Sequence, residues 1–155
     1  MTQKKKRSTL HGAIVNRRAK YDYTLGDTIT AGIVLTGQET RAARDGRVQL
    51  KGAFVTIRQN ELWLNNASFS LTLNTKGAHE TTVDTTPRKL LASRRQITQL
   101  AEQKNEGMTI VPLKLLTSGR YIKIVIALGK GKKNYDKRQA IKKRDQERDA
   151  RVKFK

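Results

Sequence analysis

A stretch of glycine and lysine near the carboxyl end has residue types suited to phosphate binding. It reads Gly129-Lys130-Gly131-Lys132-Lys133. A nucleotide-hydrolysing phosphate loop requires the spacing G-x-x-x-x-G-K-[ST], which this stretch lacks, so we reject nucleotide hydrolysis. Its glycines instead offer a flexible hinge after a strand, and its lysines can reach the phosphates of a nucleic-acid backbone. A solvated tail that merely aids solubility explains the composition equally well.

Cations on three predicted helices could likewise contact phosphates. We expect these helices over residues 13–20, over residues 38–44, and from Pro87 to Glu106, with Thr86 as the cap of the last one. Among the cations that lie on them or directly after them are Arg17, Arg18, Lys20, Arg41, Arg44, Arg47, Arg88, Lys89, Arg94 and Arg95. A charged face that is simply exposed to water explains the second helix equally well.

Three aromatic side chains could stack on nucleobases. They are Tyr21, Tyr23 and Trp63. Packing in the core is the better expectation for Trp63, which a strand over residues 61–65 would leave half-buried.

The net charge limits the partners that the chain can have. It is +20 over 155 residues, and the excess lies mainly at the two ends. A polyphosphate backbone is the commonest partner for such a charge, because neutralising phosphates releases condensed counterions. An anionic membrane is disfavoured, since the sequence has neither an apolar run long enough to span a bilayer nor a basic helix with a bulky apolar face. Nucleic acid is therefore the expected partner.

The remaining reactive side chains give little support to an enzyme or a metal site. Cysteine is absent, which excludes disulfides and thiolate ligands, and nothing argues for an oxidising compartment, so we expect a cytoplasmic protein. His11 and His79 have no second histidine at ligand spacing, so we expect both to be solvated and no metal or other cofactor to be bound. No nucleophile-elbow signature accompanies any Ser, His and carboxylate. We therefore expect no catalysis.

Short antiparallel strands must position these side chains. The sequence predicts strands over residues 30–36, 47–58, 61–65, 108–116 and 120–128. Tight turns are expected at Gln59-Asn60 and at Ser118-Gly119. Because Pro112 cannot donate to a sheet ladder, its strand is an edge or is bulged there. This pattern, with helices between the strands, predicts a mainly β fold built as a small antiparallel OB-fold-like β-barrel with flanking helices.

Two stretches of the barrel carry more detailed expectations. Within residues 47–58 we expect Gly52 to form a bulge. The side chains expected to point inward from that strand are Val48, Leu50, Phe54 and Ile57. Residues 66–86 are rich in Ser, Thr and Asn, and we expect them to form a long irregular connection.

The two ends of the chain lack what a packed core needs. Residues 1–12 carry four consecutive cations and little to bury, and we expect a flexible basic arm. Residues 130–155 hold 12 cations and 4 acids against few substantial apolar groups. Helix formers dominate from Lys137 to Arg151, so we expect a conditionally disordered basic C-terminal tail that becomes helical when an RNA surface screens its charge. The RNA-binding domain is then residues 13–129.

Five strings, in this order along the chain, resemble the SmpB family of SsrA-binding proteins. They are Asn16-Arg17-Arg18-Ala19-Lys20-Tyr21-Asp22-Tyr23, Ala31-Gly32-Ile33-Val34-Leu35-Thr36-Gly37-Gln38-Glu39, Arg88-Lys89-Leu90-Leu91, Val111-Pro112-Leu113-Lys114-Leu115 and Gly129-Lys130-Gly131-Lys132-Lys133-Asn134-Tyr135-Asp136-Lys137-Arg138. Each string alone is moderately informative. The ordered set, which ends in Gly-Lys-Lys-x-x-Asp-Lys-Arg, is highly specific.

The resemblance implies a barrel that binds the tRNA-like domain of transfer-messenger RNA (tmRNA). It implies delivery of that RNA to ribosomes stalled on broken messages, the ribosome rescue called trans-translation, and we expect a monomer with one copy per tmRNA. It further implies that the tail enters the decoding centre of the small subunit and the empty mRNA channel, where it folds as a helix. The alternative function is a structural ribosomal or initiation-type RNA-binding barrel protein.

The resemblance and the charge pattern together give two sets of candidate residues. The candidate RNA-binding residues are Asn16, Arg17, Arg18, Lys20, Tyr21, Glu39, Arg41, Arg44, Arg88, Lys89, Leu91 and Lys130. The candidate decoding-centre residues of the tail are Gly131, Lys132, Lys133, Tyr135, Asp136, Lys137, Arg138, Ile141, Lys142, Lys143 and Arg144. Asp136 is expected to orient or cap the tail, because a carboxylate weakens simple attraction to phosphates.

The sequence departs from the family pattern at two places. Thr30 stands where the family usually has a glutamate, so a hydrogen bond or ion pair near the RNA surface is lost or rearranged. The approach to Arg88, residues 83–87, is abbreviated and lacks an upstream arginine that is common in the family. We expect these changes to tune affinity rather than to abolish function.

Overall fold

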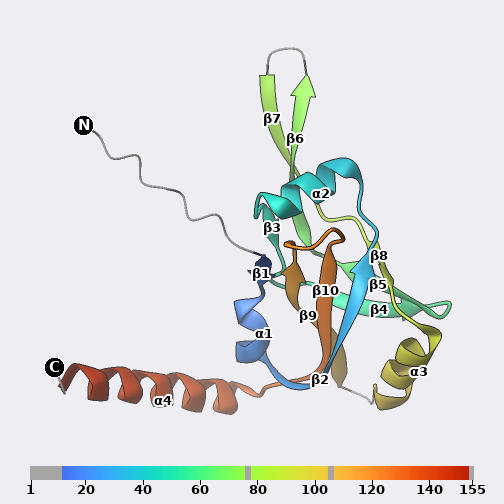
Figure 1. Ribbon diagram of the computed structural model, residues 1–155. Coiled ribbons are helices and arrows are strands. Elements are labelled where there is room, and N and C mark those ends of the chain that lie inside the picture. Colours follow the sequence, from blue (N-terminus) through green and yellow to red (C-terminus); the bar gives the residue numbers. More distant parts are fainter. Residues whose placement is uncertain (1–11, 76–77, 105–106, 154–155) are drawn as a thin grey trace, which may run out of the picture.

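The structure is a computed structural model that describes residues 12–75, 78–104 and 107–153. The basic arm predicted for residues 1–12 therefore lies outside the described residues, apart from Gly12. The strands are β1 (Ala13–Val15), β2 (Tyr23–Ile33), β3 (Val48–Gln49), β4 (Phe54–Arg58), β5 (Glu61–Asn65), β6 (Ser68–Thr75), β7 (Ala78–Asp84), β8 (Arg88–Leu91), β9 (Met108–Leu116) and β10 (Lys123–Gly131). The helices are α1 (Arg17–Asp22), α2 (Gly37–Arg44), α3 (Arg94–Gln103) and α4 (Asn134–Lys153), as Figure 1 shows.

Six strands close into a ring. The order of the main sheet is β1-β9-β10-β2-β8-β5-β4, and β4 also pairs with β9, with Val55 opposite Ile110. That additional pairing closes the ring, while β1 pairs with the carboxyl end of β9. The predicted mainly antiparallel β fold with flanking helices is confirmed.

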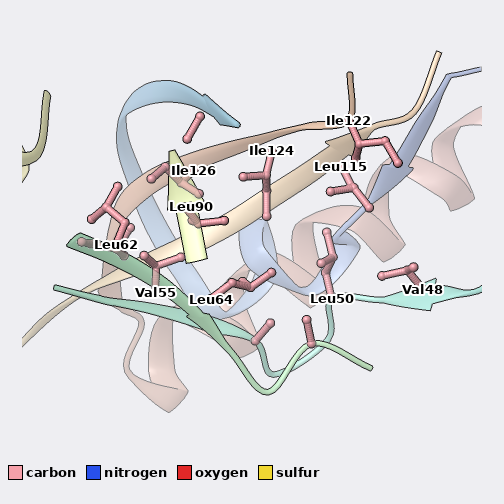
Figure 2. Close-up of a cluster of buried hydrophobic side chains, with 14 of the residues drawn as sticks. Val48, Leu50, Val55, Leu62, Leu64, Leu90, Leu115, Ile122, Ile124 and Ile126 are labelled. Carbon is pink, nitrogen blue, oxygen red and sulfur yellow. The ribbon is translucent and has the colours of Figure 1, made fainter. Parts of the chain in front are cut away.

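Aliphatic side chains from alternate positions of the strands fill the inside of the ring. Ile124, Ile126 and Leu128 of β10 are buried at two-residue spacing. Figure 2 shows Ile124 and Ile126 converging with Leu62 and Leu90 in one cluster. The same alternation places the exposed side chain of Lys123, directly before Ile124, on the outer face.

The β4–β5 hairpin confirms the predicted two-residue turn. Gln59 and Asn60 have φ values of 49° and 59°, the positive values that a type I′ turn requires. The predicted inward set is wrong at Phe54, which is 40% exposed, because Val55 faces the core in its place. The alternation restarts at β4, since Gly52, with φ of 76°, lies in a turn before that strand and not in a bulge within it.

The long irregular connection predicted for residues 66–86 is wrong, because β6 and β7 form a hairpin there. Phe69 lies opposite Asp84, and Leu71 lies opposite Thr82. Apolar residues alternate with Ser and Thr along β6, which is the two-residue period of a half-exposed strand, and threonine favours extended backbone. The hairpin pairs with β3 in a separate sheet and projects beyond α2 in Figure 1.

The helix predicted from Pro87 is also wrong at its start, because β8 comes first. Leu90 is buried opposite Leu62 of β5, and this tertiary pairing outweighs the helix-start signal before it. The helix α3 begins directly after Ser93. Ser93 and Gln96 form a capping box, in which each side chain accepts a hydrogen bond from the other residue's backbone N–H.

Residues 13–20 contain a strand followed by a helix in place of the single predicted helix. Ile14 and Val15 are β-branched and favour the extended backbone of β1.

Gly129 is not the predicted hinge, because it lies within β10. A Cβ added there would come within 2.9 Å of the Cβ of Tyr23, so the backbone is closely packed at that point.

The tail forms the helix α4, which leaves the ring soon after β10 (Figure 1). The expectation that it becomes helical only on an RNA surface stays a prediction. Its residues from Ile141 to Val152 are all exposed. Among the described residues, no helix combines the length and the apolar character needed to span a membrane.

Candidate nucleic-acid interface

Asn16 anchors α1 to the barrel. Its backbone N–H donates to the carbonyl of Leu113 at 2.7 Å, and its side-chain amide donates to the carbonyl of Pro112 at 2.9 Å. The register of β9 against β10 shifts beside Pro112, which confirms the predicted bulge. Since Asn16 is itself only 7% exposed, its role in the structure is to position α1.

A cavity of about 890 Å³ lies beside α1, and we call it the α1 groove. Its lining residues are Val15, Asn16, Arg17, Arg18, Lys20, Tyr21, Thr28, Leu113, Lys114, Val125 and Arg144. Five of these residues are cations, and none of the described residues that line it is acidic. A concave surface that combines clustered cations with apolar side chains suits a nucleic-acid backbone, whose phosphates alternate with sugars.

The root of the tail is fastened to the carboxyl end of α1. The backbone N–H of Lys132 donates to the carbonyl of Asp22 at 2.9 Å, and its Nζ donates to the carbonyl of Lys20 at 2.9 Å. On α4, the Nζ of Lys137 lies 3.4 Å from Oδ1 of Asp22. Candidate residues from the two ends of the sequence therefore meet at one place.

Tyr21 has a cation of α1 and a cation of the tail close to its ring. The guanidinium carbon of Arg18 is 5.0 Å from the ring centroid, and the Nζ of Lys137 is 5.9 Å from it. Cation–π attractions at exposed sites contribute about 0.5–1 kcal/mol each. The ring is half-buried and lines the α1 groove, so it can offer an apolar surface to a bound RNA.

A second row of residues, which includes the candidate Leu91, lies on the outer face of the barrel. Lys123, Gly32 and Leu91 stand side by side across β10, β2 and β8, and Leu91 is 54% exposed. Thr30 lies opposite Val125, which lines the α1 groove, so this row adjoins the groove. Sequence reasoning missed Lys123, although its position directly before buried Ile124 places it on the outer face.

Arg88 and Glu39 are buried, so they support the surface and do not form part of it. Two guanidinium nitrogens of Arg88 lie 3.0 Å from Oε1 of Glu39, and the side chains are 3% and 9% exposed. The guanidinium also stacks 3.9 Å from the ring centroid of Phe69. Oε2 of Glu39 accepts the backbone N–H of Thr36 in the capping box of α2. The prediction that Arg88 lies on an exposed helix is therefore wrong. Arg88 lies on β8, and its side chain contacts α2 and β6.

Asp84 extends this cluster toward the surface. Its carboxylate accepts the backbone N–H of Thr86 at 2.9 Å and lies 3.5 Å from Nη2 of Arg88. The hydrogen bonds from the Thr86 backbone and hydroxyl, together with the charge of Arg88, hold the pKa of Asp84 below its ordinary value.

The other candidates near α2 have different environments. Lys89 forms a half-exposed ion pair with Glu61 at 2.6 Å. Arg44 donates to the carbonyls of Thr117 and Arg120, at 2.9 and 3.1 Å, and so fastens α2 to the β9–β10 connection. Arg41 is exposed at the surface of α2.

The tail candidates divide into a docked root and an exposed helix. The root consists of Lys130 to Lys133, which end β10 and lead into α4. The exposed residues of the helix include Tyr135, Asp136, Arg138, Ile141, Lys142, Lys143 and Arg144. Asp136 lies in the first turn of α4, where a carboxylate is favourable for the helix dipole. The orienting or capping role expected of it stays a prediction.

In the described part of the chain, no group of His, Asp and Glu side chains is placed to hold a metal ion. His11 and the side chain of His79 lie outside the described residues, so their expected solvation stays a prediction.

Comparison with known proteins agrees with the resemblance seen in the sequence. The family model described as "SmpB protein" matches residues 13–155. An SsrA-binding protein of Streptococcus pyogenes serotype M49 is 45% identical over 144 residues, which cover 90% of each chain. An SsrA-binding protein of Streptococcus suis is 44% identical and covers 86% of each chain. A solved structure described as "tmRNA-SmpB: a journey to the center of the bacterial ribosome" matches with a TM-score of 0.63 and 32% identity, over 83% of this chain and 94% of that chain.

Proposed function

The chain belongs to the SmpB family, and we propose that it binds the tRNA-like domain of tmRNA and delivers it to stalled ribosomes for trans-translation. The descriptions of the relatives as SsrA-binding proteins, and of the solved neighbour as tmRNA-SmpB in the ribosome, support both partners. We propose that it acts by binding alone, without catalysis, as a monomer with one copy per tmRNA. Because the proposed function is carried out on the ribosome, we propose that the protein is cytoplasmic.

The observation that carries RNA binding is the α1 groove together with the row beside it. The groove gathers five cations from α1, β9 and α4, although these elements are far apart in the sequence. Lys123 and exposed Leu91 extend the surface across the barrel. We propose that phosphates bind the cations while sugars or bases contact Tyr21 and Leu91, because RNA recognition combines backbone charge with apolar and stacking contacts.

We propose that α4 occupies the decoding centre and the empty mRNA channel. Its 20 residues give a length of about 30 Å. The helix has no apolar stripe, and its residues from Ile141 to Val152 are exposed, so its greater part does not pack on the barrel. A long cationic helix of this kind suits a channel lined by RNA.

Fluorescence anisotropy with the isolated tRNA-like domain tests the proposal. We expect tighter binding to this RNA than to an unrelated RNA of equal length at physiological salt. If six to eight phosphates are neutralised, the slope of log K against log salt is about −5. Equal affinity for both RNAs, at all salt concentrations, would contradict the proposed function.

A further inference from the structure

Asp22 touches both the RNA-binding helix and the tail. Its carboxylate lies 3.5 Å from Nε of Arg18 and 3.4 Å from Nζ of Lys137. Its carbonyl accepts the backbone N–H of Lys132 at 2.9 Å. One residue at the end of α1 therefore contacts the α1 groove, the root of the tail and the first turns of α4.

The contacts of Lys132 fix the path of the chain as it leaves the barrel. The β2–β10 ladder ends with Gly131 opposite Tyr23, and the hydrogen bond from Lys132 to Asp22 continues it by one residue. The carbonyls of Lys20 and Asp22 belong to the last turn of α1, where helix carbonyls have no partner within the helix. A cation is also favourable at that end of a helix dipole. Lys132 therefore caps α1 from the opposite end of the sequence.

One face of α4 is turned toward α1. Lys137, Ala140 and Arg144 are three and four residues apart, which places them on the same side of the helix. Lys137 pairs with Asp22, Ala140 is half-buried, and Arg144 lines the α1 groove. In Figure 1, α4 starts beside α1 and then extends away from the barrel. The direction of α4 thus decides whether Arg144 stands beside the cations of α1.

We propose that Asp22 is a positioning residue that latches the tail to α1, so that α4 leaves the barrel in one direction and Arg144 completes the groove. The consequence for RNA delivery rests on the proposed function, whereas the latch itself is a property of the free protein. The ion pair is partly exposed, with side-chain exposures of 29% and 28%. Pairs of this kind are weak and are screened by salt, so the latch is reversible and an RNA surface can draw α4 away from it.

Double electron–electron resonance on the full-length free protein tests the latch by measuring the distance between two spin labels. The labels are attached to cysteines that replace two exposed residues, Gln99 on α3 and Gln146 on α4. Because the chain has no cysteine of its own, no other site is labelled. We expect one narrow distance distribution for the parent protein. Asp22→Asn and Lys137→Gln should each broaden it and raise the undocked fraction by about two- to fivefold. The double variant should be no broader than either single variant, because both remove the same contact.

Three control variants make the outcome decisive. Asp27→Asn removes an equal charge from an exposed position of β2, and Arg151→Gln removes a charge from the far end of α4, so neither should broaden the distribution. The reversed pair, Asp22→Lys with Lys137→Glu, should restore the narrow distribution. Unchanged distributions for Asp22→Asn and Lys137→Gln, or equal broadening by Asp27→Asn, would overturn the latch. Broadening in a protein that fails to select the tRNA-like domain would instead refute the proposed function and leave the latch standing.

Discussion

The guanidinium of Arg88 lies 3.0 Å from the carboxylate of Glu39, and both side chains are almost wholly shielded from water. Arg88 also donates to the carbonyl of Thr86 at 2.7 Å, so its charge is shared among several acceptors. The pair joins β8 to α2. Because Arg44 of α2 donates to the carbonyl of Thr117, the pair also supports the β9–β10 connection. A position that the family resemblance links with RNA is therefore structural in this chain.

Replacing Arg88 with Ala should destabilise the protein by about 3–5 kcal/mol, because it leaves the carboxylate of Glu39 buried without its partner. Lys89→Ala is the matched control, since its half-exposed pair with Glu61 contributes no more than about 1 kcal/mol. Urea unfolding followed by circular dichroism measures both. Similar losses in the two variants would contradict the buried-pair account.

Two glycines of the sequence motif should respond differently to alanine. At Gly129 the added Cβ meets Tyr23 at 2.9 Å and Val111 at 3.0 Å, so Gly129→Ala should cost about 1–3 kcal/mol through overpacking. At Gly131 nothing lies within 4 Å, and Gly131→Ala should change stability by no more than about 0.5 kcal/mol. Thermal unfolding of the two variants distinguishes them, and a reversed order would show that β10 is not packed as described.

The stability of the protein should depend on the ionisation of Asp84. Its pKa is lowered in the folded state, so its stabilising contribution is fully present above the ordinary aspartate pKa of about 3.9 and is lost as pH falls through the folded value. Asp84→Asn should therefore lower the urea midpoint at pH 7 and have little effect at pH values below the folded pKa. An equal effect at both pH values would contradict this assignment.

Local patterns predicted much of the fold. The Gln59-Asn60 turn and the bulge beside Pro112 both follow from neighbouring residues. The failures arose where distant contacts decide the outcome. Burial of Leu90 against Leu62 makes a strand after Pro87, where the local sequence favours a helix.

The site was predictable as a set of residues but not as a surface. Charge and family strings identify Arg17, Arg18 and Lys20, and the structure brings Arg144 beside them. The contact between Asp22 and Lys132 depends on the pairing of β2 with β10, which no local pattern gives. The burial of Arg88 was equally unpredictable, because the residue type does not show whether an arginine is exposed or buried.

Neutralising a groove cation should weaken RNA binding mainly at low salt. Arg17→Gln or Lys20→Gln should each lower the magnitude of the salt slope by about one, if each contacts one phosphate. Arg95→Gln is the matched control, because Arg95 is exposed on α3 and lies outside the groove. Anisotropy titrations over a range of salt concentrations measure the slopes. An equal change of slope for Arg95→Gln would show that the groove contributes only a nonspecific charge effect.

A truncation can separate the role of the barrel in RNA binding from the role of the tail in tagging only if it leaves the barrel intact. Truncation after Leu128 would remove the paired residues Gly129 to Gly131 and the contacts of Lys132, so it would damage the barrel itself. A stop after Lys133 removes α4 and keeps these contacts.

The most direct test measures two activities of this truncated chain: binding to the tRNA-like domain of tmRNA, and tagging of stalled products in a reconstituted translation reaction. Loss of Arg144 should raise the Kd by less than about tenfold. Tagging should fall to background, because the decoding centre and mRNA channel stay empty. Normal tagging by the truncated chain would contradict the account. Loss of RNA binding on removal of α4 would contradict it as well.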